Sequence, residues 1–431
     1  LSPACGGGKI TSTQFFLIDK GILQWCAKGI VIILYLEMSM MKTNNNNNCL
    51  TIFLEGRIDT NNAPQVEKEL LAAAEGKTDV VLDAEKLVYI SSAGLRVLMK
   101  LRKSLAKLPM INVSRDVYDI LETTGFTELL DVKKALRQVS VDGCEVIGAG
   151  GYGTVYRVDE ETVLKVYNTS SQELVESERL MSQRAFVNGI PTAIPYDTVK
   201  VGEKFGVVYE LINAGTVAQF ITAEPDKLEK YVRLFARELK KFHTIEIDDA
   251  LFADKKQYFY DITKTLGKYM TAEETAEITN YIDSIPDCKT FLHGDYNFRN
   301  VLLNNGEVIL IDIGDAGTGH PALDVAGVSI VCNYLKYTKL PPEEIRRLLG
   351  FDPELTDKIW YFFCSEYFGI STPEQVKQYT EMLTPIMLLD IVCHSLRRYA
   401  ELTEEDYLVR VNGLVRGRLL PAIRKNIPLD F

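Results

Sequence analysis

Residues 146–167 read VIGAGGYGTVYRVDEETVLKVY, and this stretch decides the fold of the larger part of the chain. It contains the pattern G-x-G-x-x-G-x-V, whose glycines are Gly148, Gly150 and Gly153. Glycine suits a phosphate-binding loop because backbone N–H groups can approach phosphate oxygens with no Cβ in the way. The same spacing marks dinucleotide-binding turns, but those turns open a helix. Here β-branched and aromatic residues follow at 154–158 and again at 163–167, so the sequence predicts two strands joined to a glycine loop.

A glycine loop between strands, with a lysine on the second strand, is the arrangement by which kinases hold nucleotide phosphates. Lys165, in V-L-K-V, is therefore the candidate for binding the α- and β-phosphates. Glu178 follows thirteen residues later, in a predicted helix over 173–186, and is the candidate ion-pair partner of this lysine. Glu176 competes for that role, and a solvated helix face would explain either glutamate.

A second group of polar residues lies in residues 293–314, which read HGDYNFRNVLLNNGEVILIDIG. Asp295 and Asn300 stand five positions apart, and Asp312 follows a predicted hairpin turn. Phosphoryl transfer needs a carboxylate that accepts the proton of the attacking hydroxyl, and oxygen ligands that hold Mg²⁺ against the phosphates. A hairpin would bring Asn300 and Asp312 to one side of a cleft, with Asp295 across from them.

The pattern H-G-D-x-x-x-x-N followed by I-D-I-G resembles the aminoglycoside phosphotransferase and choline kinase family over residues 141–431. The resemblance implies a protein-kinase-like bilobal fold with ATP and Mg²⁺ as cofactors. It also implies Asp295 as the catalytic base, with Asn300 and Asp312 as magnesium ligands. Gly294 stands where eukaryotic-like protein kinases have arginine, and no A-P-E segment follows. A small-molecule hydroxyl is therefore favoured over a protein as the acceptor.

Four stretches between residues 48 and 137 resemble a STAS domain, the fold of bacterial anti-sigma factor antagonists. They are L-E-G-R-I-D at 54–59, V-V-L-D at 80–83, Y-I-S-S-A-G-L at 89–95 and T-G-F at 124–126. The antagonists carry D-S-[ST]-G-L, whose first serine is phosphorylated by a partner kinase. Ser92 takes that place here, and Ser91 replaces the aspartate. Ser92 is thus a phosphoacceptor, a helix N-cap, or both, and the resemblance implies a protein partner.

The 431 residues are too many for one core, since a single core rarely grows past roughly 250 residues. We expect two domains, a small STAS α/β domain followed by an α+β protein-kinase-like bilobal fold. The smaller lobe should end in a strand pair and hinge at 207–212, where Glu210 and Ile212 would contact the nucleotide. The predicted boundaries are 1–42 for an unassigned segment, 43–138 for the STAS-like regulatory domain, 139–145 for a linker, 146–212 for the N-lobe and 213–431 for the helical C-lobe.

Net charge, hydropathy and cysteine spacing limit the classes of binding partner and the cellular compartment that the sequence favours. The net charge of −11 argues against binding to nucleic acid or to an anionic membrane surface. The apolar run at 30–36 is too short to span a bilayer. The eight cysteines are scattered without a C-x-x-C pair, which indicates reduced thiols in a cytoplasmic protein. Met40-Met41-Lys42 resembles a translation start, so residues 1–39 are expected to be read-through from upstream sequence and receive no function. The polar tract at 44–48 is expected to be a flexible lead-in.

These observations favour an ATP-dependent phosphotransferase acting on a small-molecule hydroxyl and regulated by a STAS module. The alternative is a partner-switching signalling protein, an anti-sigma factor antagonist with a vestigial or protein-directed kinase domain. The vestigial version is disfavoured because every residue type that the reaction needs is intact, namely Lys165, Asp295, Asn300 and Asp312.

Overall fold

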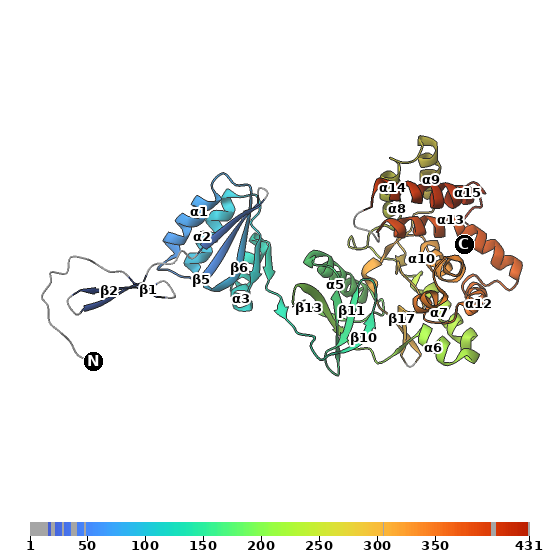
Figure 1. Ribbon diagram of the computed structural model, residues 1–431, viewed down its shortest axis with the longest axis horizontal. Helices are drawn as coiled ribbons and strands as arrows, with labels where there is room; N and C mark the ends of the chain where they lie inside the picture. Colours follow the sequence, from blue (N-terminus) through green and yellow to red (C-terminus); the bar gives the residue numbers. More distant parts are fainter. Residues whose placement is uncertain are drawn as a thin grey trace, which may run out of the picture. The chain divides into compact units, whose positions relative to one another are not determined.

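The computed structural model describes residues 16–18, 22–27, 30–35, 41–46, 49–304, 306–397 and 402–429. The chain forms two compact units that divide between Arg137 and Gln138 (Figure 1). Each unit buries its own set of apolar side chains. The expected order, a small α/β domain and then a bilobal α+β domain, is confirmed.

The segment predicted to be unassigned contains three antiparallel strands, β1 (Phe16–Ile18), β2 (Ile22–Ala27) and β3 (Ile30–Tyr35). Residues 1–15, 19–21, 28–29 and 36–40 of that segment lie outside the described residues. The lead-in prediction was wrong for residues 44–46, which belong to β4 (Met41–Asn46) and pair antiparallel with β5 (Cys49–Ile58). Backbone pairing uses N–H and C=O groups that every asparagine has, so a polar composition does not prevent it. Residues 47 and 48 are outside the described residues.

The first unit is a five-stranded sheet in the order β4-β5-β6-β7-β8. Strands β5 to β8 run parallel, and parallel neighbours need crossover connections, which helices supply here. Helices α1 and α2 pack against each other (Figure 1). The remaining elements are α1 (Ala63–Ala74), β6 (Asp79–Ile90), α2 (Ser92–Ser104), β7 (Met110–Val113), α3 (Arg115–Thr123), α4 (Phe126–Leu129) and β8 (Val132–Lys134).

The N-lobe of the second unit is an antiparallel sheet, ordered β10-β11-β12-β14-β13 and followed by the two-residue strand β9 (Arg137–Gln138). Helix α5 (Gln172–Val187) packs across β13 and β14 (Figure 1). One sheet face buries Leu164 and Val166, and the other buries Tyr167, as the two-residue period of a strand requires. The strands are β10 (Glu145–Ala149), β11 (Gly153–Arg157), β12 (Thr162–Tyr167), β13 (Pro195–Val201) and β14 (Lys204–Glu210).

The stretch predicted as a linker, 139–145, is held on this sheet. The Val139 N–H donates to the Lys200 carbonyl at 2.9 Å. Val139 and Val141 pack against the cluster around Leu164. Both valines are apolar and gain by leaving water, so they join the nearest core rather than form an extended connection.

The C-lobe is mostly helical and is built around aromatic side chains, with Phe235 of α7 stacked on Phe298 and in contact with Tyr296. None of the helices in the described ranges is long and apolar enough to span a membrane. Two small sheets carry the site, β15 (Gly215–Thr216) with β17 (Val301–Asn304) and β18 (Glu307–Leu310), and β16 (Phe291–Leu292) with β19 (Gly317–Thr318). The helices of this lobe include α6 (Val217–Ala223), α7 (Leu228–Phe242), α8 (Lys255–Leu266), α9 (Ala272–Ser284), α10 (Ala322–Ser329), α12 (Thr356–Phe368), α13 (Pro373–Arg397), α14 (Glu404–Arg410), the wide-turn helix η6 (Val411–Leu419) and α15 (Leu420–Ile423).

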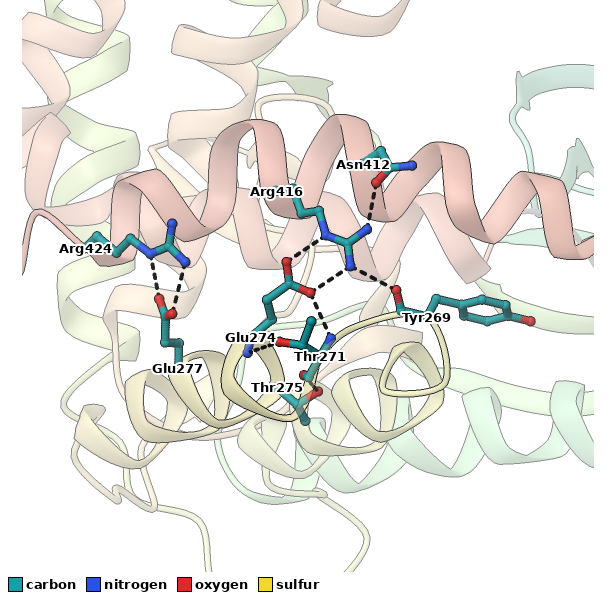
Figure 2. A network of polar contacts seen from close by, with 8 residues as sticks. All are labelled: Tyr269, Thr271, Glu274, Thr275, Glu277, Asn412, Arg416 and Arg424. Atoms are coloured by element: carbon teal, nitrogen blue, oxygen red, sulfur yellow. Dashed lines mark hydrogen bonds and ion pairs between the residues drawn. The ribbon is translucent and has the colours of Figure 1, made fainter.

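Charged side chains fasten the C-terminal helices to α9 (Figure 2). Arg416 of η6 donates from Nε and Nη2 to the two carboxylate oxygens of Glu274, at 2.6 and 2.8 Å. One turn further along α9, Arg424 forms a similar two-pronged pair with Glu277. Glu274 also accepts the Thr271 N–H at 2.9 Å, so one carboxylate both caps α9 and holds η6.

Candidate active site

Lys165 lies between two carboxylates that come from distant parts of the chain. Its Nζ is 2.6 Å from Glu178 Oε1 on α5 and 2.5 Å from Asp312 Oδ1 beyond β18. Burial alone would lower the pKa of Lys165, but the charges of Asp312 and Glu178 raise it above its ordinary value. The lysine therefore stays charged. Glu176, the competing candidate, instead binds Arg179 and Thr198.

Asp312 has an unusual backbone, with φ 65° and ψ 51° in the left-handed region. Few residues other than glycine adopt this conformation, and aspartate and asparagine do so more readily than the rest. Such residues cluster at functional sites because the surrounding structure must hold them there. The conformation turns the chain out of β18 and leaves the Asp312 side chain exposed beside Lys165.

The hairpin of β17 and β18 brings Asn300 next to the Asp312 segment. Val301 faces Leu310 in the register, and the Ile311 N–H donates to the Asn300 carbonyl at 3.0 Å. The Asn300 amide in turn donates to Asp295 Oδ2 at 3.0 Å, and Asn297 donates to the other oxygen at 3.0 Å. The structure thus brings Asp295, Asn300 and Asp312 into one region, with the amide of Asn300 orienting the carboxylate of Asp295.

The Asp295 side chain reaches solvent, but the protein around its carboxylate desolvates the charge and raises its pKa above the ordinary value. His293 and the hydrogen bond from Asn297 oppose this shift, whereas the nearby charges of Asp312 and Asp315 add to it. A carboxyl group whose pKa is raised holds a proton more readily, which suits a general base.

The loop that carries Asp295 is anchored from below by buried side chains. Asp324 of α10 accepts the backbone N–H groups of His293 and Gly294, each at 2.8 Å. The His293 ring accepts the Asp295 N–H at Nδ1 and donates from Nε2 to the Ile311 carbonyl, at 3.2 and 3.1 Å. These two contacts define one tautomer of the buried histidine, with the proton on Nε2. They also join the loop of Asp295 to the segment just before Asp312.

Gly294 could not be another residue in this arrangement. Its φ is +80°, and a Cβ there would lie 2.0 Å from the Asp315 carbonyl oxygen. In the glycine loop, only Gly153 is required by the protein's own packing, since its Cβ would lie 2.3 Å from the Val166 carbonyl oxygen. A Cβ on Gly150 would meet open space and one on Gly148 only ordinary contacts.

A cavity of about 700 Å³ runs from the glycine loop to the hinge and is mostly apolar, with Lys165, Glu178 and Asp312 in its wall. Glu210 and Ile212 both line it. The Glu210 carboxylate accepts the Ile194 N–H at 2.9 Å, so this side chain fixes the hinge. The sequence-predicted residues Gly148, Lys165, Glu178, Glu210, Ile212 and Asp312 thus share one cavity, whereas Gly150 and Gly153 are not in its wall.

A second cavity of about 390 Å³ shares no lining residue with the first and includes Gly294 and Gly314 in its wall. Its polar lining includes Asp254, Lys255, Asp261, Asp315, Asp324, Asp390 and His394. Burial raises the pKa of Asp390, and the charges of Asp295 and Asp315 act in the same direction.

The oxygen groups present would suit magnesium. Among the described residues there is no group of three or more His, Cys, Asp or Glu side chains that could hold a metal ion. Mg²⁺ does not need one, because it keeps several waters and takes one or two protein oxygens together with phosphates. Asn300, whose amide nitrogen is committed to Asp295, and Asp312 offer an amide oxygen and a carboxylate as hard donors.

Sequence reasoning missed the residues that support the predicted ones. Tyr167 donates to Glu178, and its place two positions after Lys165 on one strand was the available signal. Gly314 lies against the Glu178 carboxylate, where a Cβ would be 2.9 Å from Cδ. Asp324, which accepts the backbone N–H groups of His293 and Gly294, was not among the predicted site residues, and no local pattern in the sequence indicated this contact.

The N-terminus of α2 corrects one expectation for the first unit. The N-cap is Ser91, whose hydroxyl accepts the Gly94 N–H at 3.4 Å, and the capping role considered for Ser92 was wrong. Ser92 is the first helical residue and is exposed. Gly94 is needed because a Cβ would lie 2.7 Å from the side chains of Ile58 and Ile90.

Both domains match known families. The phosphotransferase enzyme family matches residues 143–353, and the STAS domain family matches residues 40–139. A candidate anti-sigma factor antagonist of Bordetella bronchiseptica (strain RB50), BtrV, is 38% identical over 84 residues, which are 18% of this chain and 72% of that protein. The chain therefore belongs to the STAS domain proteins through its first unit, and its second unit carries a phosphotransferase enzyme family domain.

Solved structures resemble the chain at low identity. Aminoglycoside phosphotransferase APH(2'')-Ib, solved with ADP, is 19% identical with a TM-score of 0.42, covering 65% of this chain and 93% of its own. Amicoumacin kinase hAmiN, solved with AMP-PNP, Ca²⁺ and amicoumacin, is 16% identical with a TM-score of 0.43, covering 73% of this chain and 94% of its own. Similarity at this level says nothing about the substrate of this chain.

Proposed function

We propose that the second unit transfers the γ-phosphoryl group of ATP to a hydroxyl of a small molecule. The observation that carries this proposal is the meeting of Lys165, Glu178 and Asp312 in the wall of one cavity. Asn300 is joined to the residue before Asp312 by the Ile311 N–H and donates in turn to Asp295. A structural ion pair would need only two of these groups. In kinases a lysine that pairs with a helix glutamate binds the phosphates and a nearby aspartate holds Mg²⁺, and Lys165, Glu178 and Asp312 supply these three groups.

In the proposed reaction, Asp295 accepts the proton of the acceptor hydroxyl as its oxygen attacks the γ-phosphorus. The bond from that phosphorus to the bridging oxygen breaks, and ADP leaves. Asn297 and Asn300 each donate to one Asp295 oxygen at 3.0 Å, so the carboxylate is held in one orientation rather than free to rotate. Because Asp295 must be unprotonated and its pKa is raised, the rate should increase with pH through that pKa.

Asn300 and Asp312 would hold Mg²⁺, which when bound neutralises charge on the phosphates. Lys165 would bind phosphate oxygens, and the hinge at Glu210 and Ile212 would contact the base. The acceptor would occupy the second cavity, because that cavity reaches Gly294, the residue before Asp295, and shares no lining residue with the cavity that would hold the nucleotide.

The test is a screen of ATP consumption by the full chain with Mg²⁺ against hydroxylated amines, sugars and amino sugars. The matched variant is Asp312→Asn, because asparagine tolerates the left-handed backbone whereas alanine would add strain. Acceptor-dependent ADP release by the wild type, lost in Asp312→Asn, is the expected result. Turnover that survives in Asp312→Asn, or ATP that does not bind the wild type at all, would refute the assignment.

A second candidate function belongs to the first unit, which we propose is a protein-binding module that responds to phosphorylation at Ser92. The exposed position of Ser92 at the start of α2 supports this, because a phosphate there would meet a helix N-terminus. Since Ser91 makes the cap, Ser92→Ala should leave the melting temperature unchanged and Ser91→Ala should lower it.

The experiment incubates the chain with ATP alone and with a bacterial lysate, and then maps phosphate by mass spectrometry. Phosphate on Ser92 that is lost in Ser92→Ala but kept in Ser91→Ala is expected. If Ser92 stays unmodified under both conditions, the proposed response to phosphorylation at Ser92 is refuted.

A further inference from the structure

Tyr167 is the buried neighbour of the lysine and glutamate pair. It lies two positions after Lys165 on β12, so both side chains are on the same face of the sheet. The Tyr167 hydroxyl donates to Glu178 Oε1 at 2.7 Å, and Lys165 Nζ lies 2.6 Å from that same oxygen. One carboxylate oxygen therefore receives two donors from one strand.

The direction of the tyrosine hydrogen bond follows from its surroundings. Burial, and then the neighbouring Tyr209 and Glu178, raise the pKa of Tyr167, so its hydroxyl keeps the proton and acts as donor. The Tyr209 hydroxyl lies 3.3 Å away on β14. On the far side of the carboxylate, a Cβ at Gly314 would be 3.0 Å from Glu178 Oε2, so the backbone at Gly314 closes that side.

The same part of β12 also holds the glycine loop. Tyr167 pairs with Gly153 in the register. The next residue, Asn168, donates from its backbone to the Tyr152 carbonyl at 2.9 Å and from its side chain to the Gly151 carbonyl at 3.2 Å. Residues 165–168 thus connect the lysine, the glutamate and the loop that would cover the phosphates.

We propose that Tyr167 is a positioning residue for nucleotide binding, which orients Glu178 and through it Lys165. The proposal rests on the function proposed above. An ammonium on a four-carbon stem is flexible, and a single carboxylate partner does not fix it. With the Tyr167 hydroxyl present, Glu178 Oε1 is held in one place and Lys165 has a defined position between Glu178 and Asp312. Without the hydroxyl, the glutamate can rotate and the lysine can move wholly onto Asp312.

The test uses Tyr167→Phe, which removes one oxygen from a buried ring, in the full chain. Tyr156→Phe is the matched control, because Tyr156 is half-buried on the neighbouring strand and packs on the opposite face. Glu178→Gln and the double variant complete a cycle. Affinity for ATP is measured by equilibrium binding, and KM and kcat for ATP are measured with an acceptor found in the screen. A variant that melts at a lower temperature is assayed below its transition.

Tyr167→Phe should raise the dissociation constant and KM for ATP about tenfold and leave kcat nearly unchanged, as expected for losing a hydrogen bond to a charged group. Tyr156→Phe should match the wild type. If Tyr167 acts through Glu178, the double variant should be no worse than Glu178→Gln. The positioning role would be refuted if Tyr167→Phe and the wild type bound ATP equally well, or if the effects of the two substitutions multiplied in the double variant. Neither result would affect the proposed function. A wild type that binds no ATP would overturn the proposed function and the positioning role with it.

Discussion

Replacing Glu274 by glutamine should weaken the attachment of the C-terminal helices in a way that depends on pH. The hydrogen bond from Arg416 is the main cause that lowers the pKa of Glu274 from 4.5 to about 2, against the opposing effect of burial. Glutamine keeps an oxygen that can accept the Thr271 N–H, so the substitution removes the charge and leaves the cap of α9 in place.

The magnitude follows from that pKa difference. A shift of about 2.5 pKa units corresponds to about 3.4 kcal/mol, at about 1.36 kcal/mol per unit. The Arg416 side chain is 35% exposed and that of Glu274 16%, so solvent screens the pair. We therefore expect Glu274→Gln to cost about 1–2 kcal/mol at pH 7.

The sign of the pH dependence is set by the lowered pKa. A group whose folded-state pKa is depressed contributes its full stability above the unfolded pKa and loses it as the pH falls toward the folded pKa. Between pH 7 and pH 4 the loss depends on the unfolded value of 4.5 and amounts to about 0.8 kcal/mol. The difference between wild type and Glu274→Gln should shrink by about that amount.

The assay is urea unfolding followed by fluorescence. The chain has two tryptophans, so a Trp25→Phe background leaves only Trp360, which is buried in α12 of the second unit. Glu277→Gln is the control, since Glu277 makes a similar arginine pair on the same helix but carries no cap. It should have the smaller effect. A Glu274→Gln deficit that stays the same at pH 4 and pH 7 would refute the reasoning.

Three further outcomes are expected. Asp295→Asn should keep ATP affinity and lower turnover about a hundredfold or more in steady-state assays. If the variant instead bound ATP weakly but kept a normal kcat, Asp295 would have a structural role. Lys165→Met should raise the KM for ATP, because the substitution removes the charge that would bind phosphate. An unchanged KM and kcat would mean that Lys165 takes no part in nucleotide binding. Gly294→Ala should lower the melting temperature and abolish turnover, because of the contact with the Asp315 carbonyl. The control Gly369→Ala has a similar positive φ, meets no atom within 4 Å, and should be mild.

Motifs made of neighbouring residues could be predicted from the sequence because their meaning is local. The glycine loop, the strand that carries Lys165 and the hairpin between Asn300 and Asp312 could each be predicted from the alternation of apolar residues along a strand and from the turn residues between strands. The expected α/β domain and bilobal fold also follow from such patterns. The ends of segments were less certain, as the strand at 44–46 and the sheet contacts of 139–145 demonstrate.

The choice between equivalent residues could not be made in this way. Glu176 and Glu178 have the same chemistry on one helix, and only the packing of α5 on β13 and β14 turns Glu178 toward Lys165. Ser91 and Ser92 are likewise identical side chains, and the backbone angle at the start of α2 decides which hydroxyl accepts the Gly94 N–H.

The sequence by itself determined which chemical groups are available, and it placed them on a glycine loop, a strand and a hairpin. Tertiary structure decided which of these groups meet. Lys165 and Asp312 are separated by 147 residues and lie 2.5 Å apart, a proximity that depends on the packing of two lobes rather than on any local pattern. Asp324 supports the loop of His293 and Gly294 for the same reason, because buried N–H groups need an acceptor wherever the fold supplies one.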